Sequence, residues 1–255
     1  MSELKIPKVL HYAWVGESEP NDLTKKCINS WKKYCPDYEI VLWDNKKFLE
    51  IKERSLYADQ AYEKKQWAFV SDFILFYALY HYGGIFLDSD VEITRKLDDE
   101  FLKNSFFTSY QLRIGVYPLN AIVGSEPKNI ISSDMLKIYY EIPFINRSNG
   151  KLDRVTNVVR FGEYCEKKFN LKKDYNIFDK TYLTKDNIIY PYYLFCNKER
   201  FRRNYSIHHF QYSWRDLNNH PLSAKELKKS IFYTKKDFLY KRYYFLNYEL
   251  FKLKK

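Results

Sequence analysis

Apolar side chains lie almost all round the segment Trp67–Tyr82, and this pattern predicts a largely buried helix. Gly83 can adopt the left-handed conformation that ends a helix, and Gly84 loosens the turn that follows. Residues 85–87 are apolar but too few for another helix, so they predict a short interior strand. The segment Asp88-Ser89-Asp90 comes directly afterwards. The pattern therefore predicts two carboxylates at the end of a buried strand.

Upstream of this helix, strand-like and helix-like patterns alternate. Residues 8–14 and 38–43 predict strands, and residues 22–34 between them predict an amphipathic helix that Asp22 can cap. A strand, a helix and a second strand in this order indicate a βαβ unit, and so an α/β sheet.

The pattern continues more weakly downstream. Residues 98–103 predict a charged turn or short helix, and residues 106–110 predict a strand. Two further helices are predicted at 128–140 and 155–169, with a polar connection at 141–153.

The chain has 255 residues, enough for one α/β domain with a small appendage. Its net charge is +11, and residues 221–255 hold ten Lys and Arg against three Asp and Glu, interleaved with aromatic residues. We therefore expect a catalytic domain over residues 1–220 and a basic, aromatic-rich, helical tail over residues 221–255. Such a tail favours an anionic partner, and we expect it to associate with a membrane surface, with a plain helical cover for the domain as the alternative.

The four cysteines show no metal-ligand spacing and no disulfide framework, so free thiols in a reducing cytosol are expected. The N-terminus has no long apolar segment, and no stretch approaches about 18 uninterrupted apolar residues. We therefore expect no signal peptide, no membrane span and a cytoplasmic location.

A D-x-D pair is not specific by itself, because two acids in a solvated turn are common. The position of this pair after an apolar strand favours a ligand site instead. α/β proteins bind ligands at strand ends, and fixed carboxylates there need a cation or another partner to compensate their charge. Oxygen ligands suit Mg²⁺ or Mn²⁺, which also accept substrate phosphates.

Three segments in one order make the sequence resemble the bacterial glycosyltransferases of family 32. They are IPKVLHYAWVG near the start, AFVSDFILFYALYHYGGIFLDSDVEI in the middle and HHFQYSW late in the chain. These capsular-polysaccharide and Och1-like transferases are distantly related to the glucosylating domain of the large clostridial toxins. The resemblance covers roughly residues 5–215. It implies a GT-A fold, which is Rossmann-like and binds nucleotide sugars, and retaining, metal-dependent transfer of a hexose from a UDP-sugar.

The resemblance also implies roles for single residues. Trp14 would pack on the uracil, with Ala13 offering backbone groups, although a core tryptophan is the alternative. Asp44 or Asn45 would contact the nucleoside. Asp88 and Asp90 would bind Mn²⁺ or Mg²⁺. Asp72 and Asn120 would contact the hexose, and Ser89 would lie in the cofactor site. The alternative for Asn120 is that its side chain faces a turn of the protein and not the donor sugar.

Two adjacent histidines occur in the late segment. Neighbours on a strand point to opposite faces, so at most one should meet the ion. The resemblance favours His209 as the third metal ligand, with His208 second. It also implies that Ser213 and Trp214 close over the diphosphate.

One position departs from the family pattern. Similar members carry S-D-x-x-R here, whereas this chain keeps Ser71 and Asp72 but has Leu75 in place of the arginine. The sugar preference is therefore open, with galactose or glucose favoured, and a degenerate transferase remains an alternative.

The expected acceptor is a glycan or an undecaprenyl-linked oligosaccharide in capsule or lipopolysaccharide synthesis, at the inner face of the cell membrane. A phosphatase of the haloacid-dehalogenase type is one alternative, but Glu92 stands where its pattern asks for Thr or Val. A non-catalytic, basic polyanion-binding module is another. No nucleic-acid-binding motif is present in the sequence, and nucleic acid is not an expected partner.

Overall fold

The computed structural model describes residues 3–112, 116–197 and 202–211. The chain divides into two compact units, of which the first comprises Met1–Gln111 and Tyr117–Trp214. Only Leu112 and Val116 of the second unit are described. The predicted basic tail lies outside the described residues, and so do Ser213 and Trp214. Among the described residues, no helix has the length and apolar character needed to cross a membrane.

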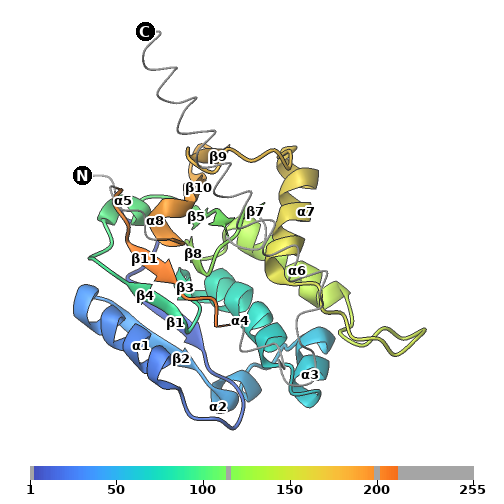
Figure 1. The fold of residues 1–255 in the computed structure, drawn as a ribbon. Coiled ribbons are helices and arrows are strands. Elements are labelled where there is room, and N and C mark those ends of the chain that lie inside the picture. The colour runs from blue at the N-terminus through green and yellow to red at the C-terminus, as the bar shows by residue number, and fades with distance from the viewer. Residues whose placement is uncertain (1–2, 113–115, 198–201, 212–255) are drawn as a thin grey trace, which may run out of the picture. The chain divides into compact units, whose positions relative to one another are not determined.

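Eight helices and eleven strands follow one another along the described chain (Figure 1). The helices are α1 (Asp22–Tyr34), α2 (Asn45–Leu49), α3 (Leu56–Glu63), α4 (Trp67–Tyr82), α5 (Asp99–Leu102), α6 (Ile130–Glu141), α7 (Asn157–Phe169) and α8 (Tyr192–Phe195). The strands are β1 (Val9–Ala13), β2 (Glu39–Trp43), β3 (Gly84–Leu87), β4 (Val91–Ile93), β5 (Phe106–Ser109), β6 (Gln111–Leu112), β7 (Val116–Tyr117), β8 (Ile122–Ser125), β9 (Thr181–Thr184), β10 (Asn187–Tyr190) and β11 (Ser206–His208).

Seven strands form the main sheet, in the order β2-β1-β3-β8-β5-β10-β9. The pairs β1–β2, β1–β3 and β5–β10 are parallel, whereas β8 runs antiparallel to both β3 and β5, and β9 runs antiparallel to β10. Because β1, β3, β5 and β10 share one direction, their carboxyl ends meet at one edge of the sheet. This edge is where an open α/β sheet places its ligand site.

The two faces of the sheet pack against different helices. Leu10 and Tyr12 on β1 join the buried cluster that contains Trp31 of α1. His11 lies between them and points to the other face, where its Nε2–H donates to Gly83 O at the end of α4 (2.9 Å). Successive residues of a strand alternate between faces, so this arrangement follows from the pleat. Figure 1 shows α4 running beside α3 and α6, with which it packs.

The structure confirms the buried helix and the interior strand. The α4 helix is deeply buried along most of its length, and β3 is buried at every residue. Gly83 and Gly84 have φ values of 66° and 100°, which L side chains rarely adopt. The four cysteines are buried free thiols.

Candidate functional site

The D-x-D turn, Asp88–Asp90, connects β3 to β4. Two backbone hydrogen bonds hold it. Val91 N–H donates to Asp88 O (3.0 Å), and Asp88 N–H donates to Ala121 O (2.9 Å). The turn is therefore fixed both internally and against the segment before β8, at the carboxyl edge of the sheet.

Asp88 is half-buried, and its carboxylate accepts no hydrogen bond from the part of the chain that the structure describes. Burial raises the pKa of Asp88 to about 7; His208 opposes the rise, whereas the charges of Asp90 and Asp72 add to it. The described residues thus compensate an ionised carboxylate in this place only in part. This is the electrostatic condition that a bound cation relieves.

Asp90 is only 9% exposed, yet its carboxylate has partners. Gln211 N–H donates to Asp90 Oδ2 (2.8 Å), and His208 Nε2 lies 3.4 Å from Asp90 Oδ1. Burial alone would raise the pKa of Asp90, but the contacts with His208 and Gln211 outweigh it and hold the pKa below its ordinary value. Asp90 is therefore the carboxylate that the protein itself stabilises.

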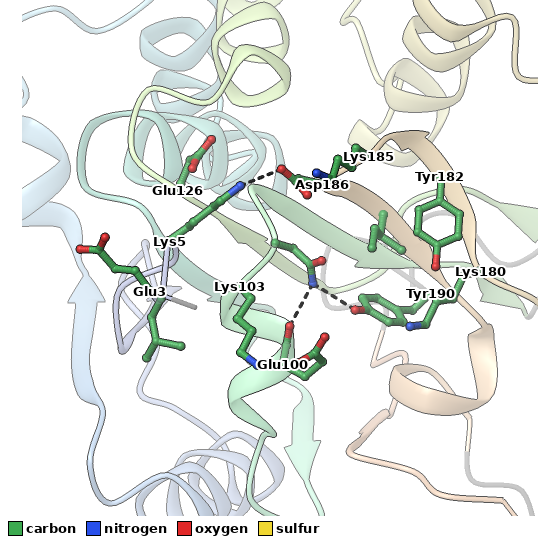
Figure 2. Close-up of a pocket in the computed structure, with 13 residues that line it drawn as sticks. Glu3, Lys5, Glu100, Lys103, Glu126, Lys180, Tyr182, Lys185, Asp186 and Tyr190 are labelled. Atoms are coloured by element: carbon green, nitrogen blue, oxygen red, sulfur yellow. Dashed lines mark hydrogen bonds and ion pairs between the residues drawn. The ribbon is translucent and has the colours of Figure 1, made fainter. Parts of the chain in front are cut away.

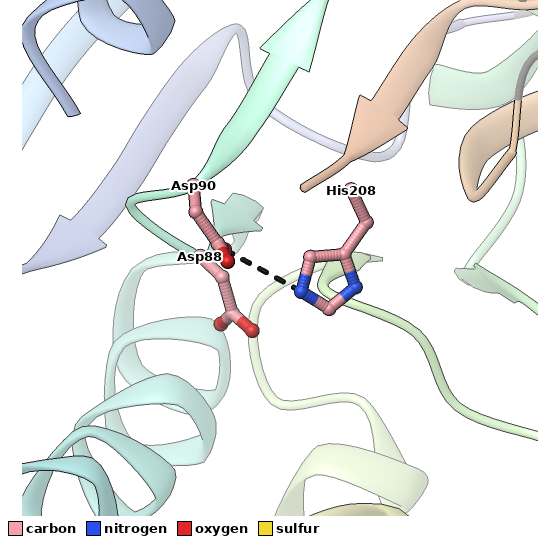
Figure 3. A group of neighbouring side chains, drawn as sticks. All are labelled: Asp88, Asp90 and His208. Carbon is pink, nitrogen blue, oxygen red and sulfur yellow. Dashed lines mark ion pairs between the residues drawn. The ribbon is translucent and has the colours of Figure 1, made fainter. Parts of the chain in front are cut away.

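Strand β11 brings the histidine to these acids. It pairs antiparallel with β4, and this register sets His208 opposite Val91, next to Asp90. One ligand atom each from Asp88, Asp90 and His208 lies within 4.8 Å of the others. Figure 3 shows these three side chains next to one another. Two carboxylates and an imidazole fit a divalent ion such as Mn²⁺, and the Asp88 carboxylate, which accepts no hydrogen bond from the described residues, supports that fit.

The structure brings His208, the second choice, beside Asp88 and Asp90, whereas His209, the first choice, faces Glu92. His209 Nε2 lies 2.9 Å from Glu92 Oε2, which also pairs with Lys26 on α1 (2.8 Å). Adjacent residues of an extended segment point apart, so only one histidine can face Asp88 and Asp90. The pairing of β11 with β4 decides which one, and this long-range register is not visible in the sequence.

Asn120, the residue expected to face the donor sugar, lies beside His208. It is 2% exposed, and its Nδ2 donates to Ser109 Oγ (3.2 Å) and Phe195 O (3.1 Å). Its Oδ1 lies 3.2 Å from His208 Nδ1. Both ends of the Asn120 amide thus have partners within the protein.

Asp72 lies on α4, where its Oδ2 accepts from the N–H of Asn157, the first residue of α7 (3.2 Å). Burial raises the pKa of Asp72 to about 7, although the Asn157 N–H and the charge of Arg160 oppose the rise. Leu75, in the place of the family arginine, is 2% exposed and belongs to the core. The cation near Asp72 is instead Arg160 of α7, which sequence analysis missed because it is remote along the chain.

The predicted nucleoside residues follow β1 and β2, at the same edge of the sheet as Asp88. Trp14 is half-buried, and its indole N–H donates to Ser18 O (2.7 Å). Asp44 Oδ1 accepts from Lys47 N–H (2.8 Å) and so caps α2. The alternative, Asn45, binds the backbone of Gly16 through both ends of its amide (2.9 and 2.6 Å). Ala13 ends β1 and Ser89 lies in the D-x-D turn, both partly exposed.

A separate polar pocket of about 780 Å³ lies near the amino ends of β5 and β10 (Figure 2). Acidic and basic side chains line it together, and two of them, Lys5 and Asp186, form an ion pair of 2.8 Å. It contains none of the predicted site residues. Its position at the amino ends of parallel strands is not where α/β sheets bind substrates.

Residues 21–108 match the family model described as the glycosyltransferase sugar-binding region containing a DXD motif. The chain is 28% identical over 190 residues to the uncharacterized glycosyltransferase L373 of Acanthamoeba polyphaga mimivirus, an alignment that covers 72% of this chain and 74% of the relative. It is 29% identical over 151 residues to the mannosyl phosphorylinositol ceramide synthase SUR1 of Saccharomyces cerevisiae, covering 55% of this chain but 38% of that protein.

Among solved structures, the PaToxG glycosyltransferase superposes with a TM-score of 0.51 at 16% identity, covering 65% of this chain and 70% of that one. This likeness supports the fold, which is of the GT-A type. The matched region includes α4, β3 and the turn Asp88–Asp90. The sequence and the fold of this chain are therefore similar to those of glycosyltransferases, and residues 21–108 match the sugar-binding region that contains the DXD motif.

Proposed function

We propose that this glycosyltransferase depends on a divalent metal and transfers a hexose from a nucleotide diphosphate sugar with retention of configuration. The observation that carries the proposal is the convergence of Asp88 and Asp90, in a turn inside the matched sugar-binding region, with His208 of β11, since one ligand atom of each lies within 4.8 Å of the others. The family resemblance supports retention. The same match argues against the phosphatase and the polyanion-binding module.

Cleavage of the donor leaves a diphosphate, and a bound cation supplies the positive charge that stabilises it. Asp88, Asp90 and His208 would hold this cation. Imidazole is a better ligand for Mn²⁺ than for Mg²⁺, which prefers oxygen, so the histidine favours manganese. Ser213 and Trp214, which the resemblance sets over the diphosphate, would exclude water from the site.

For the donor, the family resemblance favours UDP-glucose or UDP-galactose. Strands β1 and β3 are parallel neighbours, so Trp14 and Asp88 follow the same edge of the sheet. This arrangement supports a nucleoside site at Trp14 beside a diphosphate site at Asp88. A mannose donor is the second candidate, because SUR1 is named a mannosyl phosphorylinositol ceramide synthase.

For the acceptor, a glycan or a lipid-linked oligosaccharide such as an undecaprenyl-linked one is favoured. The family resemblance supports a role in capsule or lipopolysaccharide synthesis. The basic, aromatic residues of 221–255 would hold the enzyme against the anionic inner face of the cell membrane, where such a carrier resides.

A panel of nucleotide sugars tests the proposal. UDP-glucose, UDP-galactose and GDP-mannose are incubated with the full chain and Mn²⁺, and slow release of free hexose is measured by anomer-resolving NMR. Asp90→Asn is the site variant. Asp186→Asn is the matched control, because Asp186 is an exposed acid paired with Lys5 in the separate pocket.

We expect one donor to be hydrolysed by the wild type and by Asp186→Asn, but not by Asp90→Asn or after chelation of the metal. Release of the hexose with its starting configuration would support retention. Equal turnover by Asp90→Asn, or turnover that survives chelation, would contradict the metal-dependent mechanism.

A further inference from the structure

We propose that Asn120 is a positioning residue, which fixes His208 in the tautomer whose Nε2 carries a lone pair for the cation. This inference rests on the proposed metal-binding function. It assigns Asn120 a role through His208 instead of a contact with the donor sugar.

The amide of Asn120 can be oriented from its partners alone. Phe195 O is a carbonyl and can only accept, so the atom of Asn120 that lies 3.1 Å from it must be the NH₂ group. The second hydrogen of that NH₂ group points to Ser109 Oγ (3.2 Å). The amide oxygen therefore faces His208, at 3.2 Å from Nδ1.

This orientation decides the tautomer of His208. The Asn120 oxygen can only accept, so a hydrogen bond to it requires a proton on Nδ1. A neutral imidazole then carries its lone pair on Nε2, which is the atom that lies 3.4 Å from Asp90 Oδ1. The nitrogen that faces the two carboxylates is thus the one prepared to bind a metal.

Two further contacts fix the backbone of Asn120 and the imidazole ring of His208. Asn120 N–H donates to Thr108 Oγ1 on β5 (3.3 Å), so its own backbone is tied to the sheet. Phe210 stacks on the imidazole of His208, with ring centroids 3.8 Å apart and an angle of 26° between the planes. The ring is therefore held at Nδ1 and on one face.

Phe210 adopts a φ of 54°, which is unfavourable for a bulky aromatic residue. The next residue, Gln211, donates its N–H to Asp90 Oδ2. The turn at Phe210 thus positions both the ring that stacks on His208 and the Gln211 N–H that donates to Asp90. One short segment therefore supports His208 and Asp90 together.

The direct test is the tautomer of His208 in the metal-free wild-type chain, read from the ring nitrogen shifts in ¹⁵N NMR at about pH 8, above the ordinary pKa of imidazole. We expect a proton on Nδ1. A proton held on Nε2 instead would overturn the proposal, and this measurement needs no variant.

Mn²⁺ binding measured by electron paramagnetic resonance gives the second readout. Asn120→Leu removes the acceptor at similar volume, and we expect it to weaken Mn²⁺ binding roughly 10- to 100-fold and to mix the tautomers. Asn120→Asp keeps an acceptor at the same position and should retain the Nδ1–H tautomer. Asn129→Leu is the matched control, because Asn129 is equally buried but caps α6 at the other end of the sheet.

The outcomes separate the two proposals. Wild-type binding of Mn²⁺ together with unchanged tautomer and affinity in Asn120→Leu would overturn the positioning role alone. An equal loss of affinity in Asn129→Leu would overturn it too, because a general loss of stability would then explain the effect. Absence of Mn²⁺ binding by the wild type would overturn the proposed function and this inference with it.

Discussion

Asp88 and Asp90 are two residues apart, but the protein treats their charges in opposite ways. Asp90 accepts a backbone N–H and faces His208, whereas the Asp88 carboxylate accepts no hydrogen bond from the described residues. The pKa of Asp88 is raised to about 7 and that of Asp90 is lowered. The protein thus stabilises the charge of Asp90 itself, whereas a bound cation would stabilise the charge of Asp88. The D-x-D motif alone does not reveal this difference.

This contrast predicts opposite effects of two matched substitutions on the stability of the metal-free protein. At about pH 8, Asp88→Asn should raise the free energy of unfolding by about 1–3 kcal/mol, because it removes an uncompensated buried charge. Asp90→Asn should lower it by a similar amount, because it weakens the charge-assisted hydrogen bond from Gln211 N–H. Urea unfolding after chelation measures both.

The direction of each change in the free energy of unfolding follows from the pKa shifts of Asp88 and Asp90. The raised pKa of Asp88 means that its favourable contribution is present below about pH 4 and is lost as the pH rises through about 7. For Asp90 the favourable contribution is present above its unfolded pKa and is lost on acidification. Destabilisation by both substitutions at about pH 8 would refute this assignment.

At the scale of elements, the junction of α4 and β3 places the site. Gly84 has a φ of 100°, and a Cβ there would lie 2.7 Å from Val9 O on β1. Glycine thus permits β3 to approach β1 closely directly after the helix. Any shift of β3 also moves the turn Asp88–Asp90, since that turn continues the same strand.

Gly84→Ala should therefore lower the free energy of unfolding by about 2–4 kcal/mol, since it combines an unfavourable φ with a backbone clash. Gly150→Ala is the control, because Gly150 has a φ of 66° but nothing within 4 Å of the added Cβ. Urea unfolding should show a clearly smaller loss for Gly150→Ala. Equal losses would mean that the close approach at Gly84 contributes nothing.

The contact between α4 and α7 predicts a pH dependence. Asp72 caps α7 from α4, and burial raises its pKa from 3.8 to about 7. The protonated form therefore stabilises the fold below about pH 4, and this contribution disappears as the pH rises through about 7. Asp72→Asn removes the titration and keeps an acceptor for the Asn157 N–H.

We expect the free energy of unfolding of Asp72→Asn, relative to wild type, to rise by about 1–3 kcal/mol between about pH 4 and pH 8. Urea titrations at several pH values measure this difference. Asp186→Asn should show no such rise, because that carboxylate is at the surface and pairs with Lys5. A constant difference between Asp72→Asn and wild type would contradict the raised pKa.

The local sequence pattern predicts the elements that have a long apolar run or a clear amphipathic periodicity. The apolar run of α4, the three apolar residues of β3 and the amphipathic α1 were all predictable, and with them the position of the D-x-D turn. The sequence pattern does not predict α2, α3, α8, β4, β6, β7, β8, β9 and β10, which are short and depend on tertiary packing. The choice of His208 over His209 depends on the register between β11 and β4, which is set by residues more than a hundred positions apart.

At the scale of the whole molecule, the sheet gathers residues from distant parts of the sequence at one edge. Trp14, Asp88 and His208 follow or end different strands, and the parallel strands and the small sheet of β4 and β11 bring them together. The resemblance implied roles for Trp14 and Asp88 and named His208 second, but it gave no role to Phe210 and Gln211, which contact His208 and Asp90.

The charge distribution predicts a role for residues 221–255 in membrane association. Truncation before Pro221 should remove most of the binding to liposomes that contain anionic lipid, because ten cations and the aromatic residues are lost together. Co-sedimentation at low and high salt measures this. Undiminished sedimentation of the truncated chain would show that the tail is not the membrane-binding segment.

The binding of Mn²⁺ to matched histidine variants tests the central claim most directly. We predict that metal-free wild type binds Mn²⁺ at one site, that His208→Ala weakens this binding at least about 10-fold, and that His209→Ala binds nearly as well as wild type. A greater loss in His209→Ala than in His208→Ala, or no binding by the wild type, would contradict the account.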